Sequence, residues 1–389
     1  MGIIFYYYAP KGIYALKKTV AFTLSLCLFF AFPNYSAAET PYVSAVSAIL
    51  INADTGAVIF EKNSLERRAQ ASTTKIMSAL LTLEAGDLDR RFTVDSMAIR
   101  VEGTTMGLRE GDIVTRRALA QGMLLPSGND ASQAAAVSIS GSIPEFVKFM
   151  NERAERLGLK DTRFANPSGL DANGHYSTAY DLALLTMEAL KNPDFTAICS
   201  QTEIRTEYGN PPYGRWLYNN NRLLHMYNGV IGVKTGFTDN ARRCLVSAAT
   251  RDGITLIAVT LNAPDDWNDH IRMYNYGFSA VKNQPVDLDL SAVYVNVAGG
   301  CERAPVKVPE LPVLPLTDEE MRLVTVETAL LPFIYAGFEA GEQVGLLKFY
   351  YNDILLKTAP LVTAQDCCAE TEKLHPVAAF AKIIKRNIL

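Results

Sequence analysis

The stretch Ala71-Ser72-Thr73-Thr74-Lys75 opens an apolar pattern that continues to Glu84. Apolar residues recur there at helical spacing, in a stripe wide enough to predict a buried helix: Ile76, Met77, Leu80, Leu81 and Leu83. On a helix, Ser72 and Lys75 project from the same face, because residues three apart are neighbours on its surface. A neutral Lys75 amine can then take the proton of the Ser72 hydroxyl, so the stretch predicts a nucleophile with its own base.

Two more motifs follow in the order that such a site needs. Ser127-Gly128-Asn129 comes first and Lys234-Thr235-Gly236 second. An S-x-x-K pattern alone is weak, since Ser279-Ala280-Val281-Lys282 also fits it and has no partner motifs after it. The ordered set S-x-x-K, S-x-N and K-T-G is typical of penicillin-binding proteins and serine β-lactamases.

Each polar residue of these motifs has an expected role. A free lysine has a pKa of about 10.4, so Lys75 is a base at neutral pH only if it is desolvated or faces another cation. We expect Lys234 to be that cation, to stay charged, and to bind the free carboxylate of a peptide substrate together with Thr235. We expect Ser127 to relay a proton to the leaving amine, and Asn129 to hold Lys75 or bind the substrate amide.

The surrounding patterns predict an α+β fold. Short β-type runs at residues 47–52 and 57–60 flank a turn, and a second hairpin is expected at residues 245–250 and 254–260. Residues 116–190 are mostly helical in period. The simplest assembly is an antiparallel sheet built from both ends of residues 39–284, with a helical cluster beside it and a cleft between them.

A change in the hydrophobic pattern after residue 284 predicts a small all-β domain over residues 285–371. Residues 286–290 alternate strictly, a period of two continues through residue 297, and residues 346–351 and 354–357 form a hairpin pattern. Residues 372–389 follow as a basic amphipathic helix without acidic residues from Lys373 onward, which we expect to lie on an anionic membrane. The alternative is a helix docked on the β domain.

The N-terminus is typical of a secretory signal peptide over residues 1–38. Lys17 and Lys18 precede an apolar run at residues 19–32, which is shorter than the roughly 20 residues of a spanning helix. Ser36 and Ala38 fit a cleavage site. An uncleaved anchor is the alternative, and both alternatives place the working domain outside the cytosol.

Composition excludes several other classes. A hydrophobic fraction of 49% and a charged fraction of 20% in 389 residues are typical of a globular protein. The net charge of −4 gives no basic field for nucleic acid. The four histidines lack metal-ligand spacing, so no metal or cofactor is expected. A Ser-His-Asp triad explains the motifs less well than the lysine pair.

The five cysteines after residue 38 include the neighbouring residues Cys367 and Cys368, which we interpret as ordinary thiols.

Through these three motifs the chain resembles the low-molecular-mass penicillin-binding proteins that act as serine-type D-alanyl-D-alanine carboxypeptidases, peptidase family S11. The resemblance covers residues 42–360, and it implies a β-lactamase/transpeptidase-like catalytic domain and a Ser72 acyl-enzyme. It also implies an oxyanion site made by the backbone N–H groups of Ser72 and Phe237. The implied partners are peptidoglycan stem peptides and β-lactam antibiotics.

One departure and two rival functions remain. Where the family usually has Ala-Gly, this chain has Ala241-Arg242, which puts the local turn and the cleft rim in doubt. A β-lactamase would share all three motifs, although its second motif would typically read Ser-Asp-Asn. A catalytically silent wall-binding scaffold, with Arg242 blocking the cleft, is the rival from another class.

Overall fold

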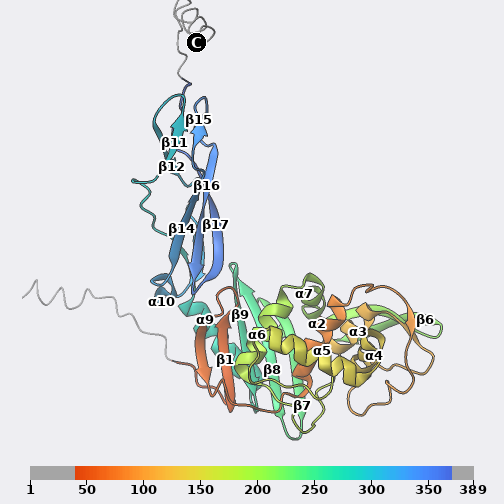
Figure 1. Ribbon diagram of the computed structural model, residues 1–389. Helices are drawn as coiled ribbons and strands as arrows, with labels where there is room; N and C mark the ends of the chain where they lie inside the picture. Colours follow the sequence, from red (N-terminus) through yellow and green to blue (C-terminus); the bar gives the residue numbers. More distant parts are fainter. Residues whose placement is uncertain (1–39, 370–389) are drawn as a thin grey trace, which may run out of the picture. The chain divides into compact units, whose positions relative to one another are not determined.

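The computed structural model describes residues 40–369, and a five-stranded antiparallel sheet lies at the centre of their N-terminal part (Figure 1). Its order is β2-β1-β9-β8-β7, so strands from both ends of the segment lie side by side, as predicted. The strands are β1 (Ser47–Asn52), β2 (Val58–Lys62), β7 (Val230–Thr238), β8 (Arg242–Arg251) and β9 (Ile254–Leu261). Strand β7 is an edge strand of this sheet.

Strand β1 shows why the sheet is covered on both faces. All six of its residues are buried. Because successive side chains of a strand point to opposite faces, Ile49 and Ile51 enter one apolar core and Ala48 and Leu50 enter another. A continuous apolar strand of this kind is therefore buried between two layers of helices.

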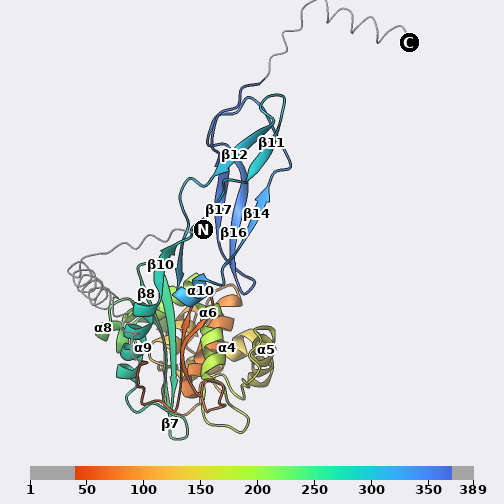
Figure 2. The ribbon, with the colours of Figure 1, turned by 90° about the vertical axis from the view of Figure 1, so that its left-hand side faces the viewer.

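The helices form those two layers. Helix α9 packs on one face of the sheet and α6 on the other (Figure 2). Helices α2 and α7 pack against α6, and α3, α4, α5 and η1 pack against α2. The predicted helix at 71–84 begins with the single 3₁₀ turn η1. The bounds are η1 (Ala71–Thr74), α2 (Lys75–Glu84), α3 (Arg116–Leu124), α4 (Asn129–Ser140), α5 (Ile143–Arg156), α6 (Ala179–Leu190), α7 (Pro193–Cys199), α8 (Leu223–Met226) and α9 (Asp266–Ala280).

A second, four-stranded sheet was not among the sequence expectations. Its order is β3-β4-β5-β6, with β3 (Phe92–Thr93), β4 (Ile113–Val114), β5 (Glu203–Gly209) and β6 (Pro212–Tyr218). Tyr208 of β5 is buried and its hydroxyl donates to the Met106 carbonyl at 2.5 Å, which ties this sheet to the loop before α3. After β6 the chain runs directly to Asn220, which reaches the site described below.

The C-terminal part is a β domain with its own apolar core. Its larger sheet has the order β14-β16-β17-β12-β11-β15, and β10 pairs with β13 in a two-stranded sheet. The helix α10 (Asp318–Met321) accompanies β10 (Lys282–Pro285), β11 (Tyr294–Ala298), β12 (Arg303–Lys307), β13 (Val313–Leu316), β14 (Thr325–Leu330), β15 (Ile334–Tyr335), β16 (Gln343–Tyr351) and β17 (Ile354–Thr363). The predicted hairpin across Asn352-Asp353 is confirmed as β16 and β17.

Two details of the C-terminal expectations are wrong. Residues 286–290 are not a strand, although their apolar residues do pack on the domain core in alternation with exposed Asp287 and Asp289. Alternating burial therefore does not require a strand partner here. Cys367 is not an ordinary thiol, because it forms a disulfide with Cys301, while Cys368 is free.

The predicted signal peptide at residues 1–38 and the end of the chain at 372–389 lie outside the described residues. Within residues 40–369, no helix combines the length and the apolar character that crossing a membrane requires. In the same part of the chain, no group of three or more His, Cys, Asp or Glu side chains is arranged to hold a metal ion.

Candidate active site

Ser72 and Lys75 lie together at the start of the buried helix. The Lys75 Nζ atom is 3.0 Å from the Ser72 Oγ atom, and the Lys75 side chain is fully buried. Burial lowers the pKa of Lys75 well below its ordinary value, Lys234 lowers it further, and Asp130 opposes the shift. The spacing expectation for this pair is met, and the lysine is placed where the neutral form is favoured.

The other contacts of Lys75 define where its lone pair points. Its Nζ donates to the Asn129 Oδ1 atom at 2.7 Å and to the Ser168 carbonyl at 2.6 Å. The amide orientation of Asn129 is fixed, because its Nδ2 donates to the Glu102 carbonyl at 2.7 Å. Exchanging the amide oxygen and nitrogen would lose this hydrogen bond. A neutral amine has two N–H groups, and these two acceptors use both. Its lone pair is then left for the hydroxyl proton of Ser72.

The second motif forms a tight loop at the start of α4. Ser127 has a positive φ of 69°, which is unusual for a residue with a side chain, and Asn129 is the first residue of the helix. A Cβ on Gly128 would lie 2.9 Å from the Met106 backbone nitrogen, so only glycine fits. This packing fixes Ser127 at the rim of the cleft and Asn129 beneath it.

Asp130 is a residue of this loop that the motif analysis did not use. Its carboxylate accepts hydrogen bonds from the backbone nitrogens of Met106, Gly107 and Leu108 at 2.8, 3.0 and 2.9 Å. It therefore holds the segment that packs against Gly128. In the sequence, the acidic residue directly after the S-x-N motif was the signal that could have identified Asp130 as a site residue.

The third motif lies on the edge strand β7, which packs against η1. A Cβ on Gly236 would lie 3.1 Å from the Ser72 backbone nitrogen, so glycine lets the strand approach the nucleophile closely. Lys234 is 1% exposed and its Nζ donates to the Thr235 carbonyl at 2.8 Å. Burial lowers the pKa of Lys234 to about 7, so the expectation that this lysine simply stays charged needs revision.

A cleft of about 400 Å³ joins the three motifs. Ser72, Ser127, Thr235, Gly236 and Phe237 line it, whereas the Lys75, Asn129 and Lys234 side chains lie buried outside its lining. The eight residues predicted from the motifs are thus brought together around one cleft or directly behind it. Other side chains that line it are Thr104, Asn220, Arg222, Arg243, Cys244, Asp266 and Trp267.

Arg242 does not line this cleft. It is exposed and adopts a positive φ of 58°, so the turn between β7 and β8 keeps a backbone conformation that favours glycine. The chain departs from the family pattern at this residue without closing the site. The next residue, Arg243, is the one that reaches the cleft.

Neither His175 nor His270 forms a hydrogen bond with the Ser72 hydroxyl. His175 accepts a hydrogen bond from the Ala165 nitrogen and contacts the Thr74 hydroxyl at 2.8 Å, and burial lowers its pKa to about 4. His270 contacts the Ser247 hydroxyl at 2.6 Å, but both residues are fully buried and belong to the layer between the sheet and α9. Neither supports a Ser-His-Asp triad at Ser72.

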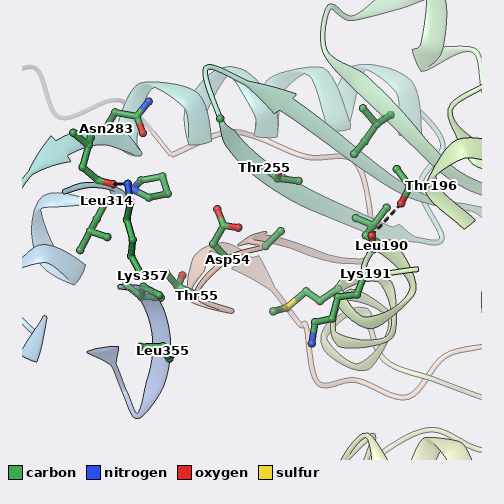
Figure 3. Close-up of a pocket in the computed structure, with 17 residues that line it drawn as sticks. Asp54, Thr55, Leu190, Lys191, Thr196, Thr255, Asn283, Leu314, Leu355 and Lys357 are labelled. Carbon is green, nitrogen blue, oxygen red and sulfur yellow. Dashed lines mark hydrogen bonds between the residues drawn. The ribbon is translucent and has the colours of Figure 1, made fainter. Parts of the chain in front are cut away.

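A larger hollow of about 790 Å³ lies elsewhere (Figure 3). Asp54, Lys191, Leu314 and Lys357 are among the residues that line it, and none of the motif residues does. Size alone therefore does not locate the chemistry of this chain. The smaller cleft is the candidate active site.

Comparisons with known proteins identify the family of this chain. A family model described as D-alanyl-D-alanine carboxypeptidase, peptidase family S11, matches residues 34–265. D-alanyl-D-alanine carboxypeptidase DacF of Bacillus subtilis (strain 168) is 37% identical over 333 residues, covering 83% of this chain and 85% of that protein. D-alanyl-D-alanine carboxypeptidase DacC of Escherichia coli (strain K12) is 30% identical over 363 residues, covering 86% and 87%.

Solved structures resemble the catalytic part. The crystal structure of the Streptomyces K15 DD-transpeptidase aligns with a TM-score of 0.59 and 34% identity, covering 62% of this chain and 100% of that chain. A D-alanyl-D-alanine carboxypeptidase from Mycobacterium tuberculosis H37Rv aligns with a TM-score of 0.59 and 31% identity, covering 63% and 95%. The family model and these relatives show that the chain belongs to the D-alanyl-D-alanine carboxypeptidase family, peptidase family S11.

Proposed function

We propose that this protein removes the terminal D-alanine from peptidoglycan stem pentapeptides through an acyl-enzyme on Ser72. The observation that carries the proposal is the contact of the Lys75 amine with the Ser72 hydroxyl, in a cleft shared with the other two motifs. Family membership supplies the substrate class, since the relatives are D-alanyl-D-alanine carboxypeptidases.

The proposed acylation step uses the geometry of the cleft directly. Ser72 Oγ attacks the carbonyl between the two D-alanines, and Lys75 takes the hydroxyl proton. The backbone N–H groups of Ser72 and Phe237 stabilise the oxyanion, which can be worth several kcal/mol in the transition state. The close approach of Gly236 to the Ser72 nitrogen supports this pair of donors, because it brings β7 beside the nucleophile.

Collapse of the tetrahedral intermediate completes the exchange. The C–N bond breaks, the leaving amine receives through Ser127 the proton that Lys75 took from Ser72, and D-alanine departs. Water then attacks the acyl-enzyme and gives a proton to the neutral Lys75. When the bond between Ser72 Oγ and the acyl carbon breaks, Lys75 returns this proton to Ser72 Oγ, and the shortened peptide is released. Asn129 keeps the Lys75 amine in place through both steps, which its 2.7 Å hydrogen bond supports.

Sequence features outside the described residues support a proposal for the site of action. The relatives are D-alanyl-D-alanine carboxypeptidases. We propose that residues 1–38 export the chain and that residues 372–389 hold it on the outer face of the cell membrane. After deletion of residues 372–389, the protein should no longer sediment with membranes, and its release of D-alanine should be unchanged.

The experiment that tests the function is incubation of the purified chain with a pentapeptide ending in D-Ala-D-Ala. Wild type should release D-alanine and Lys75→Ala should not. A fluorescent penicillin should label wild type and fail to label Ser72→Ala. Rapid turnover of the penicillin would indicate a β-lactamase instead, and absence of both labelling and D-alanine release would indicate a silent scaffold.

A further inference from the structure

Arg243 lines the same cleft as the nucleophile Ser72. Arg243 is the second residue of β8 and pairs directly with Phe237 of β7. Directly opposite residues of two strands project from the same face, and Thr235, two residues before Phe237, shares that face. Thr235, Phe237 and Arg243 all line the cleft together with Ser72.

Arg243 is held rigidly from behind. Its Nε and Nη2 atoms both donate to the Asp266 Oδ1 atom, at 3.1 and 2.7 Å. The Asp266 side chain is 4% exposed, whereas that of Arg243 is 42% exposed. The guanidinium also lies over the Trp267 ring, 5.5 Å from its centroid. Two consecutive residues at the start of α9 thus fix the guanidinium while leaving part of it open.

The fixed geometry leaves one donor edge of the guanidinium available. Asp266 occupies the edge formed by Nε and Nη2, so the edge formed by Nη1 and Nη2 remains. Within residues 40–369, the Nη1 atom donates no hydrogen bond. Two parallel N–H groups on one edge match the two oxygens of a carboxylate.

The other cations near the cleft are less suited to this task. Lys234 is buried outside the cleft lining, and its ammonium is already directed to the Thr235 carbonyl. Arg222 lines the cleft, but it is exposed and its side chain has no hydrogen-bond partner in the described part of the chain. A group that is already fixed loses less freedom on binding than one that is not.

We propose that Arg243, fixed by Asp266 and Trp267, binds the terminal carboxylate of the substrate, with Thr235 beside it. This inference rests on the proposed function and makes it more specific, because it explains selection for peptides with a free C-terminal carboxylate. Lys234 then acts from behind the cleft wall on the charge of Lys75 and does not serve as the main carboxylate ligand.

The test compares two substrates on purified full-length protein. One is a pentapeptide ending in D-Ala-D-Ala with a free carboxylate, and the other is its C-terminal amide, with release of D-alanine or D-alaninamide measured. We expect Arg243→Gln to lower kcat/KM for the acid by about 10- to 100-fold and to leave the amide nearly unchanged, since a charge-assisted pair is lost with the acid alone. For Arg243→Lys, kcat/KM for the acid should lie between the values of wild type and Arg243→Gln, because lysine keeps the positive charge but lacks the two parallel N–H donors of the guanidinium.

Three further variants make the result decisive. Arg242→Gln is the matched control, because its neighbouring guanidinium does not line the cleft, and it should keep the wild-type preference for the acid. The double variant Arg243→Gln/Asp266→Asn avoids an unpaired buried carboxylate and should also lose the preference. Arg222→Gln should retain it.

The inference is overturned if the double variant keeps the wild-type ratio of acid to amide, or if Arg222→Gln is the variant that loses it. A parallel fall on both substrates would also contradict it, since binding of the carboxylate affects the acid alone. Failure of the proposed function is distinct, because wild type itself would then release no D-alanine from the acid peptide.

Discussion

The carbonyl oxygen of Ala71 occupies the position that a side chain on Gly169 would need. An ideal Cβ on Gly169 would lie 1.9 Å from that oxygen, and the φ of Gly169 is +90°. The preceding residue, Ser168, accepts a hydrogen bond from Lys75 through its carbonyl. Contact of this loop with the residue before Ser72 therefore positions the nucleophile and its base together.

Gly169→Ala should accordingly impair both folding and acylation. The methyl group would force the loop away from Ala71 and take the Ser168 carbonyl from Lys75. We expect a loss of about 2–4 kcal/mol in the free energy of unfolding, from backbone strain and overpacking together, and at least tenfold slower labelling by a fluorescent penicillin. Denaturant unfolding and labelling rates measure the two effects.

Gly141→Ala is the control for this substitution. Gly141 has a similar φ of +77°, but apart from its own backbone and its chain neighbours no atom of the described residues lies within 4 Å of the position that its Cβ would take. The substitution should cost only about 1–2 kcal/mol of backbone strain and leave labelling unchanged. Equal effects of the two substitutions would show that the contact with Ala71 does not matter.

Asn129→Asp should alter the base without changing the shape of the site. A carboxylate would then lie where the Asn129 Oδ1 atom now accepts from Lys75 at 2.7 Å. A negative charge at this distance should raise the pKa of Lys75, because it favours the ammonium form. The acidic limb of kcat/KM for D-alanine release should therefore move to higher pH. An unshifted limb would mean that Lys75 is not the base.

Removing the second lysine should move the same limb in the same direction by less. Burial is the main cause of the low pKa of Lys75 and the charge of Lys234 is the second, so Lys234→Met removes the smaller contribution, and the pKa of Lys75 should rise. We therefore expect the acidic limb to move to higher pH. A downward shift would contradict the proposed electrostatic role of Lys234.

The stability of Lys234→Met should also depend on pH in a predictable direction. The pKa of Lys234 is about 7 in the folded chain and about 10.4 when unfolded, so unfolding takes up a proton between these values. Wild-type stability should therefore rise with pH across this window, by up to about 1.4 kcal/mol per unit. The advantage of Lys234→Met over wild type should be largest below pH 7 and shrink towards pH 10. A difference independent of pH would argue against a lowered pKa.

The local chemistry of the site was accessible from sequence because it depends on short spacings. Ser72 and Lys75 belong to one helical turn, so their contact follows from helix geometry. The joining of the three motifs could be expected from their order, through a family pattern. No bounds were predicted for the strand of the third motif. In the structure, Gly236 shows why that motif needs a glycine facing η1.

Long-range contacts account for what sequence reasoning missed. Ser168 contacts Lys75 through a backbone carbonyl, which leaves no trace in its residue type. Arg243 and Asp266 lie 23 residues apart and meet only after β8, β9 and α9 have packed. Residues 286–290 show the opposite case, in which a clear period of two produced alternating burial without a strand partner.

The disulfide between Cys301 and Cys367 closes a long segment of the C-terminal β domain, with a sequence separation of 66. Closing a loop of this size restricts the unfolded chain, which should stabilise the domain by about 3–4 kcal/mol. The variant Cys301→Ser/Cys367→Ser should therefore unfold at lower denaturant concentration in the transition of this domain. Penicillin labelling of Ser72 should persist, since none of the residues that line the cleft belongs to the β domain.

Cys368→Ser, which removes an exposed free thiol, is the control and should unfold like wild type. Loss of labelling together with the disulfide would mean that the β domain supports the active site directly.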